Sequence, residues 1–214
     1  MGGAGLIEAF VPDLDLRPAL ADVVASGAGY VRSALAPGYL ARLVDEVEGG
    51  PFRSYREQFA QVRQQIEGFD LDRPFAGFPL IAELCRSVRE QVQRQGEAIR
   101  GLRTWSINEA GVIRYRPGSI GITSHLDGKR HRRLVVVLSL RGTAEFALCA
   151  DRSGTVVSAW EPEPGSLTIL RGPGLAGRRD GRPFHRVGTP KTGQRLAIGL
   201  RMSVPPDRPD PPSP

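Results

Sequence analysis

The second half of the chain, from Thr104 onward, consists of short apolar stretches separated by turns that contain glycine or proline. Stretches of this length, divided in this way, are typical of β-strands rather than helices. Residues 134–140 form an almost uninterrupted apolar run, which predicts a buried strand. The pattern therefore restricts this half of the chain to a structure built from many short strands.

The first hundred residues have the apolar spacing of helices. Helices are expected near residues 39–47 and 80–99, with a strand near 29–32. The helix at 80–99 has one apolar stripe that can pack against a sheet, formed by Leu80, Ile81, Leu84, Val88 and Val92. Helices followed by many strands predict an α+β fold, in which a double-stranded β-helix (jelly-roll) core has N-terminal helices packed on its sheet.

The length of the chain indicates a single domain. A chain of 214 residues with 40% hydrophobic residues can form one compact core. We expect this domain to span residues 1–203, with a mainly helical part at 1–103 and the jelly-roll core at 104–203. Residues 204–214 are rich in proline, which neither pairs in a sheet nor continues a helix, so we expect them to be disordered.

The sequence contains no signal for a membrane or for secretion. No apolar run approaches the roughly 18 to 20 residues of a membrane span, and the N-terminus lacks a basic start followed by an apolar stretch. The two cysteines, Cys85 and Cys149, provide no disulfide framework and are expected to be core thiols. We therefore expect a soluble, cytoplasmic protein with no membrane partner.

Two of the three histidines form a pattern typical of a metal site. In a strand, residues two apart project from the same face, so His125 and Asp127 can reach one metal while His185 arrives from a second strand. Two imidazoles and one carboxylate on one side of an octahedron leave the opposite positions open, as in the facial triad of non-haem Fe(II) oxygenases. A His-x-Asp pair also arises by chance on surfaces and in loops, so the pattern alone is weak evidence.

The last predicted strand, residues 195–202, strengthens this interpretation. One of its faces is apolar, whereas the other carries Arg195, Ala197, Gly199 and Arg201. A guanidinium that points into a barrel is costly unless an anion meets it, and its planar fork suits a carboxylate. The strand therefore predicts a diacid as a ligand.

Together these residues resemble the Fe(II)/2-oxoglutarate dioxygenases, and within them the AlkB-like branch. The resemblance covers residues from about 105 to 202. It implies that His125, Asp127 and His185 bind Fe(II) and are the catalytic centre. It also implies that 2-oxoglutarate is the co-substrate, bound by three residues: Arg195 at its distal carboxylate, Arg201 near its metal-bound end, and Tyr115 through a hydrogen bond.

The departures from this branch lie outside the metal site. Ile113, Ala197 and Gly199 stand where AlkB-type proteins commonly have Asn, Asn and Thr. After Asp127, the nucleic-acid repair members place acidic residues that contact the damaged base, but here Gly128, Lys129 and Arg130 follow. The residues therefore support oxygenase chemistry more than they support DNA repair.

From the resemblance we expect a dioxygenase that oxidises, and most simply hydroxylates, a C–H bond of a small-molecule or natural-product substrate. Oxidative decarboxylation of 2-oxoglutarate to succinate and carbon dioxide would accompany this step. One alternative is an AlkB-like oxidative demethylase of alkylated nucleobases, and another is a non-catalytic jelly-roll binding protein. Asp127 argues against a halogenase, whose related sites lack this carboxylate.

Two further features leave alternatives open. The chain has a net charge of +6, and its densest basic cluster is residues 129–133, Lys-Arg-His-Arg-Arg. This cluster is either a solvated loop or a site for an anionic group of a small substrate or of a nucleic acid, and we do not count His131 as a metal ligand. Residues 51–77, which show no clear period, are either a substrate lid or a surface helix and loop.

Overall fold

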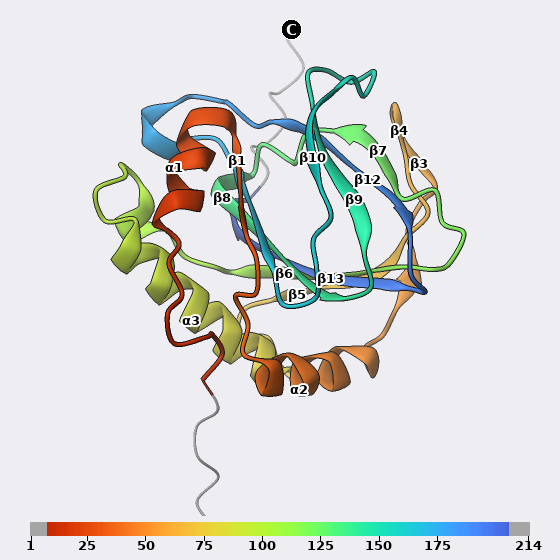
Figure 1. The fold of residues 1–214 in the computed structure, drawn as a ribbon, viewed down its shortest axis with the longest axis horizontal. Helices are drawn as coiled ribbons and strands as arrows, with labels where there is room; N and C mark the ends of the chain where they lie inside the picture. Colours follow the sequence, from red (N-terminus) through yellow and green to blue (C-terminus); the bar gives the residue numbers. More distant parts are fainter. Residues whose placement is uncertain (1–7, 206–214) are drawn as a thin grey trace, which may run out of the picture.

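Two antiparallel β-sheets face each other in the computed structural model, which describes residues 8–205 (Figure 1). The larger sheet has the order β1-β11-β8-β13-β6-β5-β2, and the smaller sheet has the order β10-β9-β12-β7. The strands of the larger sheet are β1 (Ala28–Val31), β2 (Arg53–Ser54), β5 (Glu67–Asp72), β6 (Glu109–Tyr115), β8 (His131–Arg141), β11 (Leu167–Arg171) and β13 (Arg195–Ser203). Those of the smaller sheet are β7 (Ile122–His125), β9 (Ala144–Cys149), β10 (Val156–Trp160) and β12 (Phe184–Pro190). A separate hairpin consists of β3 (Gln58–Phe59) and β4 (Val62–Arg63).

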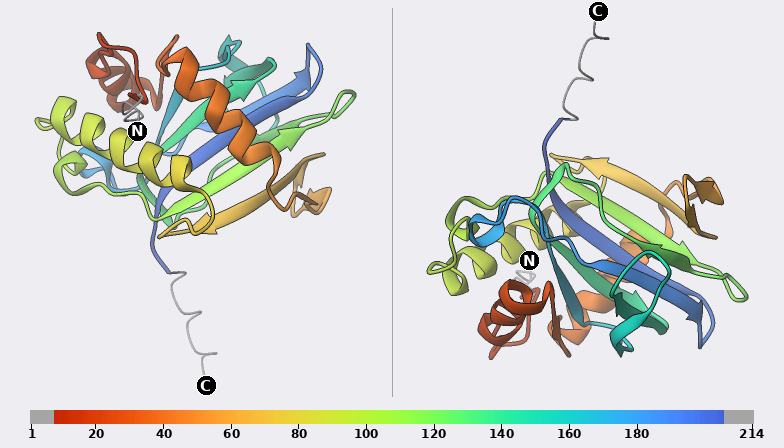
Figure 2. Two further views of the ribbon diagram at one scale, coloured as in Figure 1. Left: turned by 90° about the horizontal axis from the view of Figure 1, so that it is seen from below. Right: turned by 90° about the horizontal axis from the view of Figure 1, so that it is seen from above.

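Helices cover the outer face of the larger sheet, as Figure 2 shows for α2 (Pro37–Glu48) and α3 (Pro79–Gln95). The apolar stripe of α3 is buried there, as its spacing predicted. The helix begins where the Glu46 carboxylate of α2 accepts the N–H groups of Leu80 and Ile81, at 2.9 and 3.0 Å. It ends at Gln95, four residues before the expected end. Gly96 follows, where a Cβ would lie 2.5 Å from the side chain of Leu102.

Strand β8 shows why the molecule has two cores. Leu134, Val136 and Leu138 point from this strand toward the helices and join the larger core. Val135 and Val137, which alternate with them, face the space between the two sheets. Because both faces are covered in the middle of β8, residues 134–138 are all apolar and lack the alternation of a half-exposed strand.

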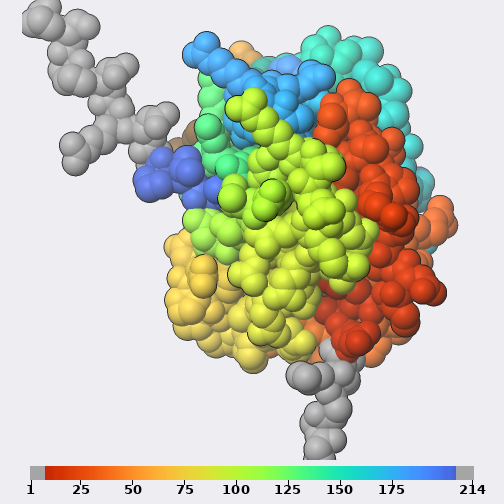
Figure 3. Space-filling view, turned by 90° about the vertical axis from the view of Figure 1, so that its left-hand side faces the viewer, coloured from red at the N-terminus to blue at the C-terminus, as the bar shows by residue number. Residues whose placement is uncertain are grey.

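The first helix, α1 (Arg17–Ser26), lies beside α3, and Figure 3 shows this side of the molecule. Gln95 of α3 connects the two by accepting the N–H of Leu16 at 2.7 Å and donating to the carbonyl of Leu14 at 3.0 Å. The helix also lies directly against β1, because a Cβ at Gly29 would lie 2.1 Å from the carbonyl oxygen of Ala19. Glycine at this position therefore permits the close approach of helix and strand.

The structure confirms the predicted order of helices and then strands, with one important difference. Strands were expected at 29–32 and 134–140, and they occur as β1 and β8. Residues 51–77 also supply β2 and β5 to the larger sheet, although no strand was predicted in this segment. The segment contains short strands, so the surface helix that was one of the two alternatives for it was wrong.

Three remaining expectations concern single features. Both cysteines are buried and free, as expected of core thiols. Among the helices of residues 8–205, none combines the length and the apolar character needed to cross a membrane. Most of the tail expected at 204–214 lies outside the described residues, but the N–H of Val204 donates to the carbonyl of Arg130 at 3.0 Å.

Candidate metal centre

The smaller sheet brings the three predicted metal ligands together. His125 at the end of β7 lies directly opposite His185 on the neighbouring strand β12. Asp127 follows two residues after His125, and its Oδ1 lies 3.9 Å from Nε2 of His185. One ligand atom from each of the three residues lies within 4.8 Å of the other two. The three side chains therefore meet at one point, although up to 60 positions separate them in the sequence.

Backbone contacts orient both imidazoles toward this point. Nδ1 of His125 lies 2.9 Å from the carbonyl oxygen of Thr123, and Nδ1 of His185 lies 3.1 Å from that of Pro183. A carbonyl can only accept, so each Nδ1 carries the proton and each Nε2 keeps a free lone pair. The ring of Phe146 stacks on His185 at a centroid distance of 5.4 Å and fixes that ring from one side.

The charge states of these residues also suit a cation. Burial, assisted by neighbouring His185, lowers the pKa of His125 to about 4, so this imidazole is neutral near pH 7. Burial opposes ionisation of Asp127, but His185, His125 and Arg201 outweigh it and hold the pKa of the carboxyl below its usual value. Two imidazoles and one carboxylate form a donor set that binds Fe(II) and similar divalent ions.

Arg195 lies in the same cavity as these ligands, with an exposed fraction of only 2%. Its Nε is buried and has no hydrogen-bond partner among the described residues. The nearest aromatic group is Tyr115, directly opposite on β6, with the guanidinium carbon 5.1 Å from the ring centroid. A buried guanidinium with an unsatisfied N–H is costly, so its position indicates that an anion belongs beside it.

One cavity of about 240 Å³ joins all six residues predicted from the sequence. Its lining includes His125, Asp127, His185, Tyr115, Arg195 and Arg201. Apolar side chains make up much of the remaining wall between the sheets: Ile66, Ile113, Ile122, Val135, Val137, Phe146, Leu170 and Val187. The cavity therefore combines an apolar interior with a few convergent polar groups, as ligand sites commonly do.

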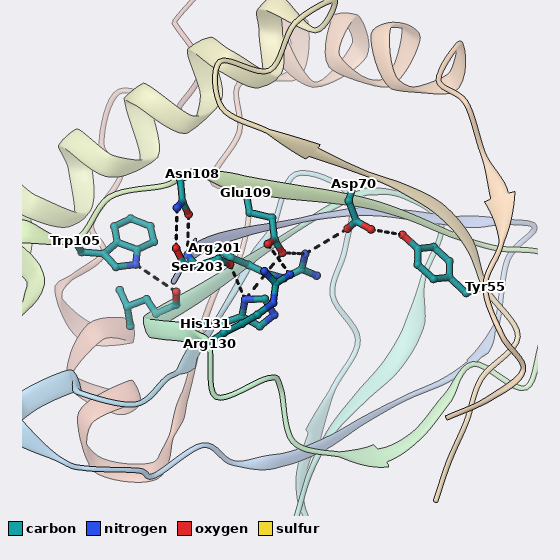
Figure 4. Close-up of polar contacts among 10 residues, drawn as sticks. Tyr55, Asp70, Trp105, Asn108, Glu109, Arg130, His131, Arg201 and Ser203 are labelled. Atoms are coloured by element: carbon teal, nitrogen blue, oxygen red, sulfur yellow. Dashed lines mark hydrogen bonds and ion pairs between the residues drawn. The ribbon is translucent and has the colours of Figure 1, made fainter. Parts of the chain in front are cut away.

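Arg201 is held by acidic residues that the sequence analysis did not identify. Its Nη1 lies 3.2 Å from Oε1 of Glu109 and 3.8 Å from Oδ1 of Asp70 (Figure 4). Glu109 lies in register with Arg201 and is separated by even spacing from Tyr115, so its inward direction could have been inferred. No comparable signal pointed to Asp70, because the strand that carries it was not predicted.

Residues of the basic cluster at 129–133 contact residues that do not line the cavity. Arg130 pairs with Oε2 of Glu109 at 2.7 Å, and Nδ1 of His131 lies 2.8 Å from Oγ of Ser203. Arg133 donates to the carbonyl of Gly101 at 2.7 Å. None of the residues 129–133 lines the cavity, and His131 lies outside the group of three possible ligands, as expected.

The segment 51–77 contributes to the outer wall of the cavity. Tyr55, Gln64, Ile66 and Asp70 all line it. The hairpin β3–β4 lies beside β7, where the N–H of Arg63 donates to Oγ1 of Thr123 at 3.0 Å. The segment therefore forms part of the cavity wall, and its role as a substrate lid stays a prediction.

Comparisons with known proteins support the fold. No protein-family model matches the chain, and no curated protein sequence matches it. Among solved structures, a prolyl-4-hydroxylase from Pseudomonas putida aligns with a TM-score of 0.60 and 17% identity, over 89% of this chain and all of that chain. A 2OG-Fe(II) oxygenase family oxidoreductase from Burkholderia pseudomallei aligns with a TM-score of 0.61 and 16% identity, over 89% of this chain and 92% of that chain. OsALKBH1 aligns with a TM-score of 0.53 and 18% identity, over 82% of this chain and 98% of that chain.

These likenesses show that the chain has the α+β double-stranded β-helix fold predicted from its sequence. OsALKBH1 is similar to this chain, but its TM-score is lower than that of the prolyl-4-hydroxylase. The fold is therefore shared with several kinds of oxygenase.

Proposed function

We propose that this protein is an Fe(II)- and 2-oxoglutarate-dependent dioxygenase. The observation that carries the proposal is the buried, unpaired Nε of Arg195 in the same cavity as His125, Asp127 and His185. A metal site alone would not require a buried cation beside it. A ligand that binds the metal at one end and offers a carboxylate at the other would satisfy both features.

The residues present fit these two groups. His125, Asp127 and His185 would hold Fe(II), whose chemistry couples oxidative decarboxylation of 2-oxoglutarate to oxidation of a substrate C–H bond. Arg195 would bind the distal carboxylate, since a guanidinium presents two parallel N–H donors to it. Arg201, at the outer part of the cavity, would contribute positive potential toward Asp127 and the metal-bound end.

Tyr115 and the apolar wall complete the co-substrate site. Burial, partly offset by Arg195, raises the pKa of Tyr115, so its hydroxyl is protonated and can donate a hydrogen bond to the co-substrate. The side chains of Ile113, Val137 and Leu170 line the same cavity and exclude water from it. A dry site strengthens the attraction between Arg195 and a carboxylate.

For the substrate, we propose a small molecule that undergoes hydroxylation. The basic residues 129–133, which could have followed a nucleic-acid backbone, are instead engaged in part by Glu109, Ser203 and Gly101. The AlkB-like alternative, demethylation of a nucleobase, requires acceptors for the amino group of the base. Succinate and formaldehyde released only with methylated oligonucleotides would establish that alternative instead.

Anaerobic titration with Fe(II) and 2-oxoglutarate tests the proposal. We expect one Fe(II) per chain and a charge-transfer absorption when both components are present. Asp127→Ala and His185→Ala should each abolish the absorption and the oxygen-dependent formation of succinate, because two ligands cannot define the facial geometry.

The matched control is Asp45→Ala, which removes an exposed carboxylate on α2, outside the cavity. This variant should behave like the unmodified protein. Normal titration of Asp127→Ala would contradict the metal assignment. A wild-type protein that binds Fe(II) without any response to 2-oxoglutarate would contradict the co-substrate.

A further inference from the structure

A connected group of charged residues lies beside the metal cavity, and Figure 4 shows it in the larger sheet. Two of its members, Asp70 and Arg201, line the cavity. At the centre of the group, Arg201 lies between Glu109 and Asp70. The hydroxyl of Tyr55 donates to Oδ2 of Asp70 at 2.8 Å. Burial, with a further contribution from Asp70, raises the pKa of Tyr55 to about 12, so this hydroxyl stays protonated and Asp70 stays the acceptor.

The charges in this group balance, but they are not equally accessible to a ligand. Glu109 is paired with both Arg201 and Arg130, so one acid is shared by two arginines. The exposed fraction of the side chain is 48% for Asp70, 16% for Arg201 and 6% for Glu109. A molecule that enters the cavity therefore meets the carboxylate of Asp70 more than it meets the guanidinium of Arg201.

One oxygen of Asp70 remains available for a ligand. Tyr55 occupies Oδ2, whereas Oδ1 lies 3.8 Å from Nη1 of Arg201, which is beyond the length of a hydrogen bond. An ionised carboxylate can only accept hydrogen bonds. The available position therefore requires a donor, and a positively charged donor forms the strongest bond of this kind.

Two glycines hold this arrangement in place. Gly111 of β6 and Gly199 of β13 lie directly opposite each other in the sheet. A Cβ at Gly111 would lie 2.6 Å from Nη1 of Arg201 and 2.9 Å from Oδ1 of Asp70. The side chains of Asp70 and Arg201 therefore occupy the space beside Gly111 that the Cβ of any other residue would fill.

We infer that Asp70 is the specificity-determining residue of this cavity, and that the substrate carries a protonated amino group on an apolar body. The inference deepens the proposed function and rests on it for the reaction. The amino group would donate to Oδ1 of Asp70, while the apolar body would contact neighbouring wall residues such as Ile66 and Ile122. The charged end would thereby fix which carbon of the substrate lies nearest to the three metal ligands.

Three probes of equal chain length test this inference: hexylamine, hexanol and hexanoate. Their dissociation constants are measured by ligand-observed NMR under anaerobic conditions, with the full chain alone and with Fe(II) and 2-oxoglutarate. We expect hexylamine to bind roughly tenfold more tightly than hexanol, as one hydrogen bond to a charged group allows, and hexanoate to bind most weakly.

Variants assign the preference to Asp70. Asp70→Asn should abolish the difference between hexylamine and hexanol, and Asp70→Lys should make hexanoate the preferred probe. Tyr55→Phe keeps the carboxylate and should retain the preference, which shows that the effect does not come from a general disturbance of the wall. Asp45→Asn, the same change on an exposed face of α2, should leave all three constants unchanged.

The outcomes separate this inference from the proposed function, because the charge-transfer absorption is recorded on the same samples. Equal binding of hexylamine and hexanol, or a preference that survives Asp70→Asn, would overturn the role of Asp70 while leaving the dioxygenase proposal intact. A preference that depends on Asp70, in a protein that shows no response to Fe(II) and 2-oxoglutarate, would support the amine site and refute the proposed reaction.

Discussion

At the scale of single residues, Arg195 stands out because its side chain is buried and its Nε has no hydrogen-bond partner within residues 8–205. Burial lowers the pKa of its guanidinium, yet a group of this kind remains charged at neutral pH. The buried charge of Arg195 therefore lowers the stability of the ligand-free protein, and a bound anion would remove this loss. Sites that are arranged to bind a charged molecule commonly have such a cost in the free state.

The first prediction concerns replacement of Arg195 by residues of similar length. Arg195→Met should stabilise the ligand-free protein by about 1–3 kcal/mol, because it removes a buried charge and fills the same space. It should also weaken 2-oxoglutarate binding by about 2–5 kcal/mol, the range for loss of one partner of a buried charge pair. Urea unfolding and titration of the charge-transfer absorption measure the two effects.

Arg195→Lys provides the comparison, since it keeps the charge but loses the planar fork. It should recover part of the affinity for 2-oxoglutarate without the gain in stability. If both variants bind 2-oxoglutarate as the unmodified protein does, the distal carboxylate lies elsewhere.

At the scale of secondary structure elements, one arginine connects the first helix with the segment that precedes His185. Arg171 of β11 donates through Nε to the carbonyl of Gly181 at 2.6 Å. Its Nη1 donates to the carbonyls of Val23 and Val24 in the last turn of α1, at 3.3 and 2.9 Å. The carbonyl of Val23 also accepts the N–H of Gly27 at 3.1 Å. The positive charge of Arg171 stabilises this C-terminal end of the helix.

The second prediction follows from this connection. Arg171→Ala should weaken Fe(II) binding by roughly three- to tenfold, somewhat less than the loss of a group that directly orients a ligand. The reason is that the segment before His185 loses its attachment to α1, although Arg171 does not line the metal cavity. Competition with a chelator measures the affinity, and Arg32→Ala, on an exposed ion pair with Glu163, is the control.

The same elements show how much of the structure the sequence could predict. Strands β8 and β13 were predicted because each has a regular pattern, a central apolar run in β8 and an alternating pattern in β13. Strand β5 was not predicted, because only Phe69 and Leu71 face the apolar core, while Gly68 and Asp70 alternate with them. Its cavity face is polar for a functional reason, so the periodicity that normally identifies a strand is weak.

The site was predicted to a similar extent. Residues that follow a spacing rule, such as His125 with Asp127 or Arg195 with Arg201, could be identified from the sequence. Tyr55 and Asp70 reach the cavity only because β5 joins the sheet beside β6. Long-range strand pairing of this kind has no local signature, so the residues that it places in the cavity could not be identified beforehand.

At the scale of the whole molecule, stability should depend on pH through His131, a partly buried histidine. Burial, together with Arg201 and Arg130, lowers the pKa of His131 to about 4, although Glu109 and Asp127 act in the opposite direction. The unfolded chain binds this proton at its ordinary pKa of about 6.5, before the folded protein does. Stability from this group is therefore present above pH 6.5 and is lost as the pH falls toward 4.

The third prediction is that metal-free protein loses stability between pH 6.5 and 4, and that His131→Gln makes this loss smaller. Glutamine cannot be protonated but can still hydrogen-bond to Ser203, which His131 contacts. His125 has a similarly lowered pKa, so part of the pH dependence should remain in the variant. Melting temperatures recorded across this pH range measure the effect, and identical slopes for the two proteins would exclude His131 as a contributor.

Arg195 and Asp70 lie at different depths, and this difference predicts the order in which their two ligands bind and leave. Arg195 is 2% exposed, whereas the Asp70 side chain in the same cavity is 48% exposed. We therefore expect a molecule held by Asp70 to lie nearer to solvent than a molecule bound at Arg195. We expect 2-oxoglutarate to bind before the substrate. A substrate bound at Asp70 should then slow the dissociation of 2-oxoglutarate. As a fourth prediction, saturating hexylamine should slow the release of 2-oxoglutarate in a stopped-flow chase, and an unchanged release rate would mean that each ligand has its own exit.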